Sequence, residues 1–191
     1  NAQTGLSGIN FGNFLIKRVV DSLSKELPNL KTFATLSPIP GFNEWLDKRL
    51  EDNSFDLLTA EQNQVLMAAV EMPSPQASLR ELIFDTRWYE DEYKSKILKA
   101  PLLRLCAHYL LNEKRVSGTS FDSVAHFHLN NGAGLEQLNW QADFSERGLL
   151  QSNGIMLNYL YDLRTIDANH ESYRAGEPVI ASAALKNLLK D

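Results

Sequence analysis

The chain has 191 residues, with 19 lysines and arginines against 24 aspartates and glutamates, which gives a formal net charge of −5. Hydrophobic residues make up 43% and charged residues 23%, close to globular averages, so a disordered or low-complexity chain is excluded. The acidic balance argues against nucleic acid or an anionic membrane surface as a partner, and no apolar run approaches the roughly 20 residues of a membrane span. The single cysteine, Cys106, can form neither an internal disulfide nor a cysteine-based zinc site.

Neither end of this sequence contains a recognisable targeting signal. Residues 1–4 contain no charged and apolar leader, and residues 189–191 do not match a peroxisomal signal. These features predict a cytoplasmic location. The sequence begins with residues typical of a loop, and a predicted helix follows directly with no strand before it. This order indicates a piece of a longer polypeptide.

A glycine-containing turn at residues 5–12 leads into the first predicted helix. Apolar residues then recur at helical spacing over residues 14–23, which is typical of a helix that packs on a core. Asn13 is a suitable N-cap for this helix. A β-branched and aromatic stretch, residues 31–36, predicts a buried strand. The strand is expected to stop at residues 37–41, where two prolines forbid a helix or an inner strand.

From residue 42 to about residue 116 the pattern is helical. Pro101 falls within the last helical stretch and is expected to mark a break or a new start. The expected helices cover residues 42–50, a stretch that opens at the capping box Thr59–Gln62 and ends before Pro73, residues 78–84, and residues 90–111.

After Gly118 the pattern changes to that of strands. Residues 121–129 alternate between two faces and predict a strand, followed by the strong turn dipeptide Asn131-Gly132. Residues 135–142 would return as its partner, and residues 154–163 predict a further strand, although their methionine and leucine run fits a helix equally well. The fold class is therefore α+β, with helices, a mixed sheet and an inserted helical stretch.

Two loop features suggest a site, and each has a more common explanation. Gly8 and Gly12 precede a helix N-terminus, where free amides and the helix dipole favour an anion such as a pyrophosphate. An ordinary tight turn before a helix is the more frequent meaning of such a glycine pair. Ser37 lies at a strand end beside a rigid loop, a typical position for a site residue. Most serines in that position are ordinary loop residues.

Histidines and tyrosines in the predicted strands offer further candidates. His126 and His128 are two residues apart and would share one face of a strand. A metal site lacks an evident third ligand, so the alternatives are a proton donor or one solvated and one core histidine. Tyr159 and Tyr161 also share a face, but aromatic strand residues usually serve packing.

Several blocks of the sequence together resemble the malonyl-CoA decarboxylase family, specifically the C-terminal part of its catalytic domain. The Ser-Pro-Ile-Pro-Gly-Phe and Phe-His-Leu motifs are the most specific of them. The matching blocks are residues 12–20, 36–42, 127–133, 139–143 and 154–161.

This resemblance implies a GNAT-like acyltransferase fold, with a mixed sheet flanked by helices. Residues 1–191 would be the C-terminal portion of that catalytic domain, with a helical insertion at about residues 43–116 and without the first strands of the fold. The family converts malonyl-CoA to acetyl-CoA and CO2 without a metal. The implied partner is malonyl-CoA, and the CoA thioester is the substrate, so no separate cofactor is expected. The full-length chain is expected to form a homo-oligomer. Neither nucleic acid nor a membrane is expected as a binding partner.

The resemblance also implies roles for individual residues. Ser37 matches the family's catalytic serine, His128 its catalytic histidine and Tyr161 a functionally important tyrosine. Family members can carry a glutamate where this sequence has Asn10, so a charged role at that position is not carried over. The loop that would bind the CoA pyrophosphate comprises Ser7, Gly8, Ile9, Asn10, Phe11, Gly12 and Asn13.

Decarboxylation of a β-carbonyl thioester leaves an enolate, which needs a stabilised oxyanion and a proton donor. We therefore expect His128 to protonate the enolate and Ser37 to hydrogen-bond the malonyl group or the imidazole, with Tyr161 orienting one of them. Two alternatives remain open from the sequence. They are an acyl-CoA-dependent N-acyltransferase on the same fold and a non-catalytic acyl-CoA-binding module.

Overall fold

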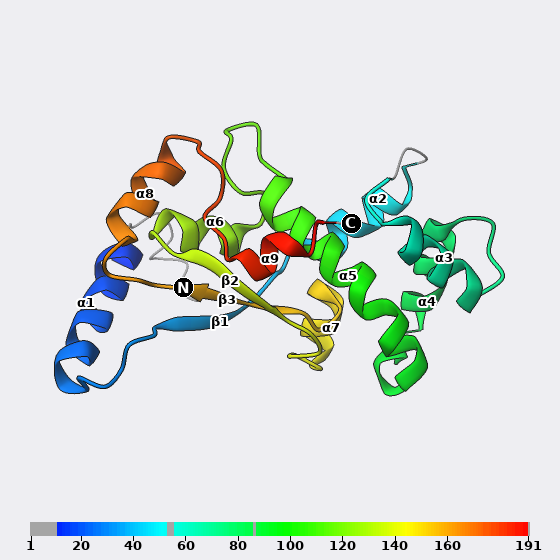
Figure 1. Ribbon diagram of the computed structural model, residues 1–191, viewed down its shortest axis with the longest axis horizontal. Helices are drawn as coiled ribbons and strands as arrows, with labels where there is room; N and C mark the ends of the chain where they lie inside the picture. Colours follow the sequence, from blue (N-terminus) through cyan, green and yellow to red (C-terminus); the bar gives the residue numbers. More distant parts are fainter. Residues whose placement is uncertain (1–10, 53–55, 86, 191) are drawn as a thin grey trace.

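The computed structural model describes residues 11–52, 56–85 and 87–190, and a three-stranded sheet lies at its centre (Figure 1). Its strands β1 (Ala34–Pro38), β2 (Gly134–Asn139) and β3 (Met156–Leu160) are antiparallel, and β3 lies between the other two. An isolated parallel bridge from Leu135 to Ala181 extends the sheet beyond its named strands. The architecture is α+β, as the sequence predicts.

Helices surround this sheet and extend beyond one of its ends. In Figure 1, α1 and α8 lie at one end of the sheet, and α3 and α4 lie at the far end of the molecule beyond α5. The helices are α1 (Phe11–Glu26), α2 (Phe42–Leu50), α3 (Ala60–Ala69), α4 (Pro75–Phe84), the 3₁₀ helix η2 (Trp88–Glu90), α5 (Glu92–Asn112), α6 (Ser123–Asn130), α7 (Glu146–Ser152), α8 (Ile166–Arg174) and α9 (Ala183–Asn187).

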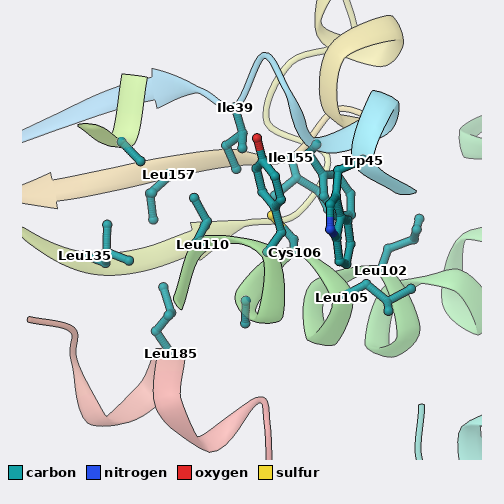
Figure 2. Packing of buried hydrophobic residues seen from close by; sticks show 14 of the residues in the cluster. Ile39, Trp45, Leu102, Leu105, Cys106, Leu110, Leu135, Ile155, Leu157 and Leu185 are labelled. Atoms are coloured by element: carbon teal, nitrogen blue, oxygen red, sulfur yellow. The ribbon is translucent and has the colours of Figure 1, made fainter. Parts of the chain in front are cut away.

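The core forms where α5 packs against one face of the sheet. Figure 2 shows Cys106 and Leu110 of α5 beside Leu135 and Leu157 of the sheet, with Leu185 contributed by α9. Each of these side chains is at most 1% exposed. Burial of this apolar surface is the main favourable contribution to folding, and it fixes the face of the sheet on which helices can lie.

The helical region between residues 42 and 112 agrees closely with its sequence signals. Helix α2 has the predicted bounds, and α3 begins at the predicted capping box, in which Thr59 and Gln62 exchange side-chain and backbone hydrogen bonds. The predicted break at Pro101 is wrong, because α5 continues through this residue. Pro101 is itself buried in the core, and the packing of the leucines around it outweighs the backbone hydrogen bond that it removes.

The predicted strand over residues 121–129 is wrong, because residues 123–130 form helix α6. The side chain of Asp122 caps this helix. The buried residues Ala125, His128 and Leu129 follow the helical spacing i, i+3, i+4. The alternation read from the sequence was weaker evidence than the aspartate cap that precedes it.

This correction changes the role of the Asn131-Gly132 turn. Gly132 has a φ of +78°, a conformation that suits glycine, but the turn joins α6 to β2 rather than two strands. Strand β2 then pairs with β3, so residues 135–142 do have an antiparallel partner, located at residues 156–160.

Two boundaries near the N-terminal end also differ from prediction. Asn13 lies inside α1 and is therefore not its N-cap. Strand β1 extends to Pro38, so that Ser37 lies within the strand and not in the loop after it. A proline is tolerated there because it sits at the last position of a strand that pairs on one side among the described residues.

Within the described ranges, no helix has the length and apolar character needed to cross a membrane. The helices α2 to α5 occupy the stretch that the sequence assigns to a helical insertion. Whether they interrupt a GNAT-like fold stays a prediction.

Candidate active site

Ser37 and His128, which are 91 positions apart in the sequence, meet on the covered face of the sheet. Oγ of Ser37 lies 3.2 Å from Nε2 of His128. Strand β1 supplies the serine, and the last turn of α6 supplies the histidine. Folding thus places a hydroxyl and an imidazole within hydrogen-bond distance, as a candidate pair for proton transfer requires.

Two tyrosines, Tyr159 in β3 and Tyr161 directly after it, fix the imidazole of His128. The hydroxyl of Tyr161 lies 2.6 Å from Nδ1 of His128. The ring of Tyr159 stacks on the imidazole, with ring centroids 4.1 Å apart and an angle of 20° between the planes. The three residues expected to be catalytic, Ser37, His128 and Tyr161, are therefore in contact, and Tyr159 adds a packing surface.

The hydrogen bonds around His128 assign its neutral tautomer. The Ser37 hydroxyl donates its proton to a hydrogen bond with Thr35, so its oxygen is left to accept from Nε2–H of His128. Burial raises the pKa of the Tyr161 hydroxyl above its usual value, so this group stays protonated and donates a hydrogen bond to the unprotonated Nδ1. The ring proton of His128 then resides on Nε2 and faces Ser37. The Ser37 hydroxyl in turn donates to Oγ1 of Thr35 at 3.0 Å. A directed chain of hydrogen bonds runs from Tyr161 through His128 and Ser37 to Thr35.

Thr35 is the residue in this series of hydrogen bonds that was not predicted from the sequence. It lies two residues before Ser37, so both side chains project from the same face of β1. That spacing would have indicated Thr35 once the strand was known to include Ser37.

Burial sets the charge of the site. Ser37 is 6% exposed and His128 is 7% exposed. Desolvation lowers the pKa of His128 to about 4, because removal from water disfavours the charged imidazolium. The resting imidazole is therefore uncharged at neutral pH.

This lowered pKa predicts a pH-dependent stability. An unfolded histidine binds its proton near pH 6.5, whereas folded His128 binds it only near pH 4. Between these values the unfolded chain holds more protons, so the free energy of unfolding falls as the pH falls from 6.5 to 4. The loss from His128 amounts to about 3 kcal/mol, complete below pH 4 and absent above pH 6.5.

Chemical denaturation at pH 7 and at pH 4 measures this effect. The variant His128→Gln keeps a polar side chain but removes the titrating group. From pH 7 to pH 4 its free energy of unfolding should therefore decrease by about 3 kcal/mol less than that of the unmodified protein. The other titrating groups are shared by both proteins. An identical pH dependence in both would contradict the buried neutral imidazole.

His126, the second histidine of α6, does not join this site. Residues two apart on a helix lie about 200° apart around its axis, so the shared face predicted for His126 and His128 does not exist. Nδ1 of His126 instead lies 2.8 Å from the hydroxyl of Tyr173 on α8. The side chain therefore links two helices.

Cys106 is a free cysteine in the core. Cys106 is fully buried, and burial raises the pKa of its thiol, as expected for a small core residue. In the described part of the chain, no three histidine, cysteine, aspartate or glutamate side chains gather so that they could hold a metal ion. A reaction without metal remains a prediction.

Only part of the predicted pyrophosphate loop lies within the described residues. Ser7, Gly8, Ile9 and Asn10 lie outside them. Phe11, Gly12 and Asn13 are the first described residues of α1. An ion pair between Lys17 of α1 and Asp167 of α8 connects these two helices, which Figure 1 shows side by side at one end of the sheet.

The family is decided by a comparison over the whole chain. The family model described as "Malonyl-CoA decarboxylase C-terminal domain" matches residues 1–191. The chain belongs to the malonyl-CoA decarboxylase family. The resemblance inferred from the five sequence blocks is thereby confirmed.

Relatives and solved structures agree with this membership. The mitochondrial malonyl-CoA decarboxylase of Anser anser anser is 40% identical over 185 residues, which cover 95% of this chain and 36% of that protein. The mitochondrial malonyl-CoA decarboxylase of Mus musculus is 41% identical over 192 residues, covering 98% and 39%. This chain therefore spans less than two fifths of the length of these two curated relatives.

Crystal structures of two bacterial malonyl-CoA decarboxylases have the same fold. The enzyme from Rhodopseudomonas palustris superposes with a TM-score of 0.84 at 41% identity, covering 98% of this chain and 40% of that one. The enzyme from Agrobacterium vitis gives a TM-score of 0.85 at 40% identity, covering 100% and 44%. The contact between Ser37 and His128 thus occurs in a malonyl-CoA decarboxylase-type fold.

A groove of about 730 Å³ on the sheet is lined in part by Tyr161 of the candidate site, but Ser37 and His128 do not line it. It is lined by residues such as Lys31, Glu136 and Asn158, and its Arg164 pairs with Asp162. The charge of this groove is therefore mixed and partly neutralised.

Proposed function

We propose that the protein containing this chain decarboxylates malonyl-CoA to acetyl-CoA and CO2, with Ser37, His128 and Tyr161 in the active site. The observation that carries the proposal is the contact between Ser37 and His128, found in a chain that belongs to the malonyl-CoA decarboxylase family. The relatives named above carry that activity in their names.

The reaction breaks the bond between the α-carbon and the carboxylate of the malonyl group. The electron pair moves into the thioester as an enolate, whose oxygen needs a hydrogen-bond donor and whose α-carbon needs one proton. Malonyl-CoA and one proton therefore give acetyl-CoA and CO2. In our proposal His128 delivers the proton, and the Ser37 hydroxyl hydrogen-bonds the malonyl group or the imidazole.

The low pKa of His128 suggests how the proton arrives. The free imidazole is neutral at pH 7 because its pKa lies at about 4. A substrate carboxylate brought next to Nε2 would favour the imidazolium. When CO2 leaves, the negative charge moves onto the enolate, and the imidazolium can donate its proton to the α-carbon. Tyr161 holds Nδ1, so Nε2 stays directed toward Ser37 and the reacting group.

We further propose that the segment from Ser7 to Asn13 receives the CoA pyrophosphate, with the amides at the start of α1 as donors. The positive end of a helix dipole supports an anion at that position. The substrate itself brings the CoA group, so no additional cofactor is proposed. The homo-oligomer, the cytoplasmic location and the GNAT-like architecture remain predictions.

Incubation of the purified protein with malonyl-CoA, with and without an amine acceptor, tests the proposal. Release of CO2 and formation of acetyl-CoA without an acceptor are the expected results. Acyl transfer that requires an amine would favour the N-acyltransferase. Binding of malonyl-CoA without any turnover would favour a non-catalytic binding module, and either result would overturn the proposed decarboxylation.

A further inference from the structure

Asp122 is a buried carboxylate that contacts both chain segments of the candidate site. It immediately precedes α6 and is 1% exposed. Its Oδ1 accepts hydrogen bonds from the backbone N–H groups of Val124 and Ala125, each at 2.9 Å. This oxygen therefore caps the helix that carries His128, which lies less than two turns farther along α6.

The other oxygen of Asp122 binds the segment that follows Ser37. Oδ2 accepts a hydrogen bond from the backbone N–H of Gly41 at 3.2 Å and from the hydroxyl of Tyr109 at 3.3 Å. Gly41 lies four residues after Ser37, at the entrance to α2. One carboxylate thus joins the β1–α2 segment to the N-terminus of α6.

The chain between Ser37 and Gly41 is stiff enough to transmit this restraint. Pro38 and Pro40 fix their own φ angles, and Ile39 between them is completely buried. Gly41 also lies too close to Tyr109 for a larger residue, because an added Cβ would lie 2.3 Å from the Tyr109 hydroxyl. A displacement of Gly41 would therefore move Ser37 relative to His128.

We propose that Asp122 is a positioning residue for the reaction, holding the Ser37 segment and the His128 helix at hydrogen-bond distance from each other. The expected effect of Asp122 on turnover rests on the proposed function. Its expected effect on the positions of Ser37 and His128 does not. The positioning role goes beyond helix capping, which needs only one acceptor oxygen. Ser145 performs that simpler role for α7 with a single hydroxyl.

Burial of this carboxylate is consistent with such a role. Desolvation raises the pKa of Asp122, and its hydrogen bonds partly oppose this rise. All four donors are uncharged groups. Removing a carboxylate from water costs free energy. In Asp122 each carboxylate oxygen accepts hydrogen bonds from backbone N–H groups of the segments that carry the candidate site.

The variant Asp122→Ser separates capping from positioning. Serine is as good an N-cap as aspartate, so α6 keeps its cap, but the single hydroxyl cannot also reach Gly41. The matched control is Asp91→Ser, since Asp91 caps α5 through the N–H groups of Tyr93 and Lys94 and contacts neither Ser37 nor His128. If Asp122→Ser does not fold, Asp122→Asn replaces it, because one amide oxygen can serve only one of the two segments.

The expected result is a decrease in kcat of about tenfold for Asp122→Ser, since a misplaced catalytic group can cost up to 10²-fold. KM for malonyl-CoA should change less than twofold, and Asp91→Ser should keep both values. The variant Tyr109→Phe removes the side-chain donor but leaves all three backbone hydrogen bonds to Asp122, so its kcat should change less than twofold. An equal loss in Tyr109→Phe, or no loss in Asp122→Ser, would overturn the inference.

A second readout does not require turnover. The ¹⁵N chemical shifts of the His128 ring report its tautomer, and Asp122→Ser should reduce the population with the proton on Nε2, whereas Asp91→Ser should not. If the unmodified protein does not decarboxylate malonyl-CoA, the proposed function fails but these shifts still test the geometry. Unchanged shifts in Asp122→Ser would overturn the positioning role, whatever the activity.

Discussion

Replacement of His128 by glutamine should slow the release of CO2 from malonyl-CoA by about 10³-fold, the usual contribution of a positioned general acid. Glutamine fills a similar volume and can still hydrogen-bond Ser37, but it has no proton to transfer. The CoA group should bind elsewhere, at the start of α1, so the affinity for CoA should change less than twofold. Steady-state CO2 release and calorimetric titration with CoA measure the two quantities.

A matched control lies on the same helix. His126 is two residues away, projects from a different side of α6 and contacts Tyr173. The variant His126→Gln should therefore keep kcat within about twofold, at a cost to stability of about 1 kcal/mol from the lost hydrogen bond. Equal losses of activity in the two variants would show that helix α6 is disturbed as a whole. A large loss of CoA affinity in His128→Gln would contradict the separation of binding from proton transfer.

The fold was most predictable where a local signal agreed with the tertiary structure. The capping box at Thr59 and Gln62 marks a helix start through backbone hydrogen bonds that depend only on neighbouring residues. Residues 154–163 were predicted as a strand, although their methionine and leucine run fitted a helix equally well, and β3 confirms the strand. Both predictions needed no knowledge of distant parts of the chain.

The fold was least predictable where tertiary packing opposed a local signal. Pro101 lies in the middle of α5 because the leucines of that helix fill the core. Residues 121–129 alternate like a strand, yet the cap at Asp122 and the burial of Ala125, His128 and Leu129 require a helix. When a sequence fits both the helix and the strand periodicity, packing in the core determines which of the two structures forms.

The candidate site shows the same division. Ser37, His128 and Tyr161 were identified by resemblance to a family, and no spacing in the sequence could place three residues that lie up to 124 positions apart in contact. Thr35 escaped notice because the predicted strand ended before Ser37, and Asp122 because its importance depends on the two chain segments that it joins. The low pKa of His128 likewise follows from burial, which becomes known only with the fold.

Removal of the Tyr161 hydroxyl in Tyr161→Phe should lower kcat by about 10²-fold while KM for malonyl-CoA changes little. This hydroxyl is the partner of Nδ1 at 2.6 Å, and without it the ring proton can move to Nδ1 and the imidazole can rotate. The size of the effect follows from misdirection of the proton-donating group itself, which can cost up to about 10²-fold. Steady-state kinetics measure it, and the ¹⁵N shifts of the His128 ring should reveal the changed tautomer.

Tyr159 provides the control, because its ring contacts His128 and it also carries a buried hydroxyl. That hydroxyl has no hydrogen-bond partner among the residues that the structure describes, whereas the ring of Tyr159 stacks on the imidazole. The variant Tyr159→Phe keeps the stacked ring and removes an unsatisfied polar group, so kcat should stay within about twofold and the free energy of unfolding should rise by about 1 kcal/mol. If Tyr159→Phe lost as much activity as Tyr161→Phe, the polarity of the pocket rather than the bond to Nδ1 would control the reaction. The orientation of His128 by Tyr161 would then be wrong.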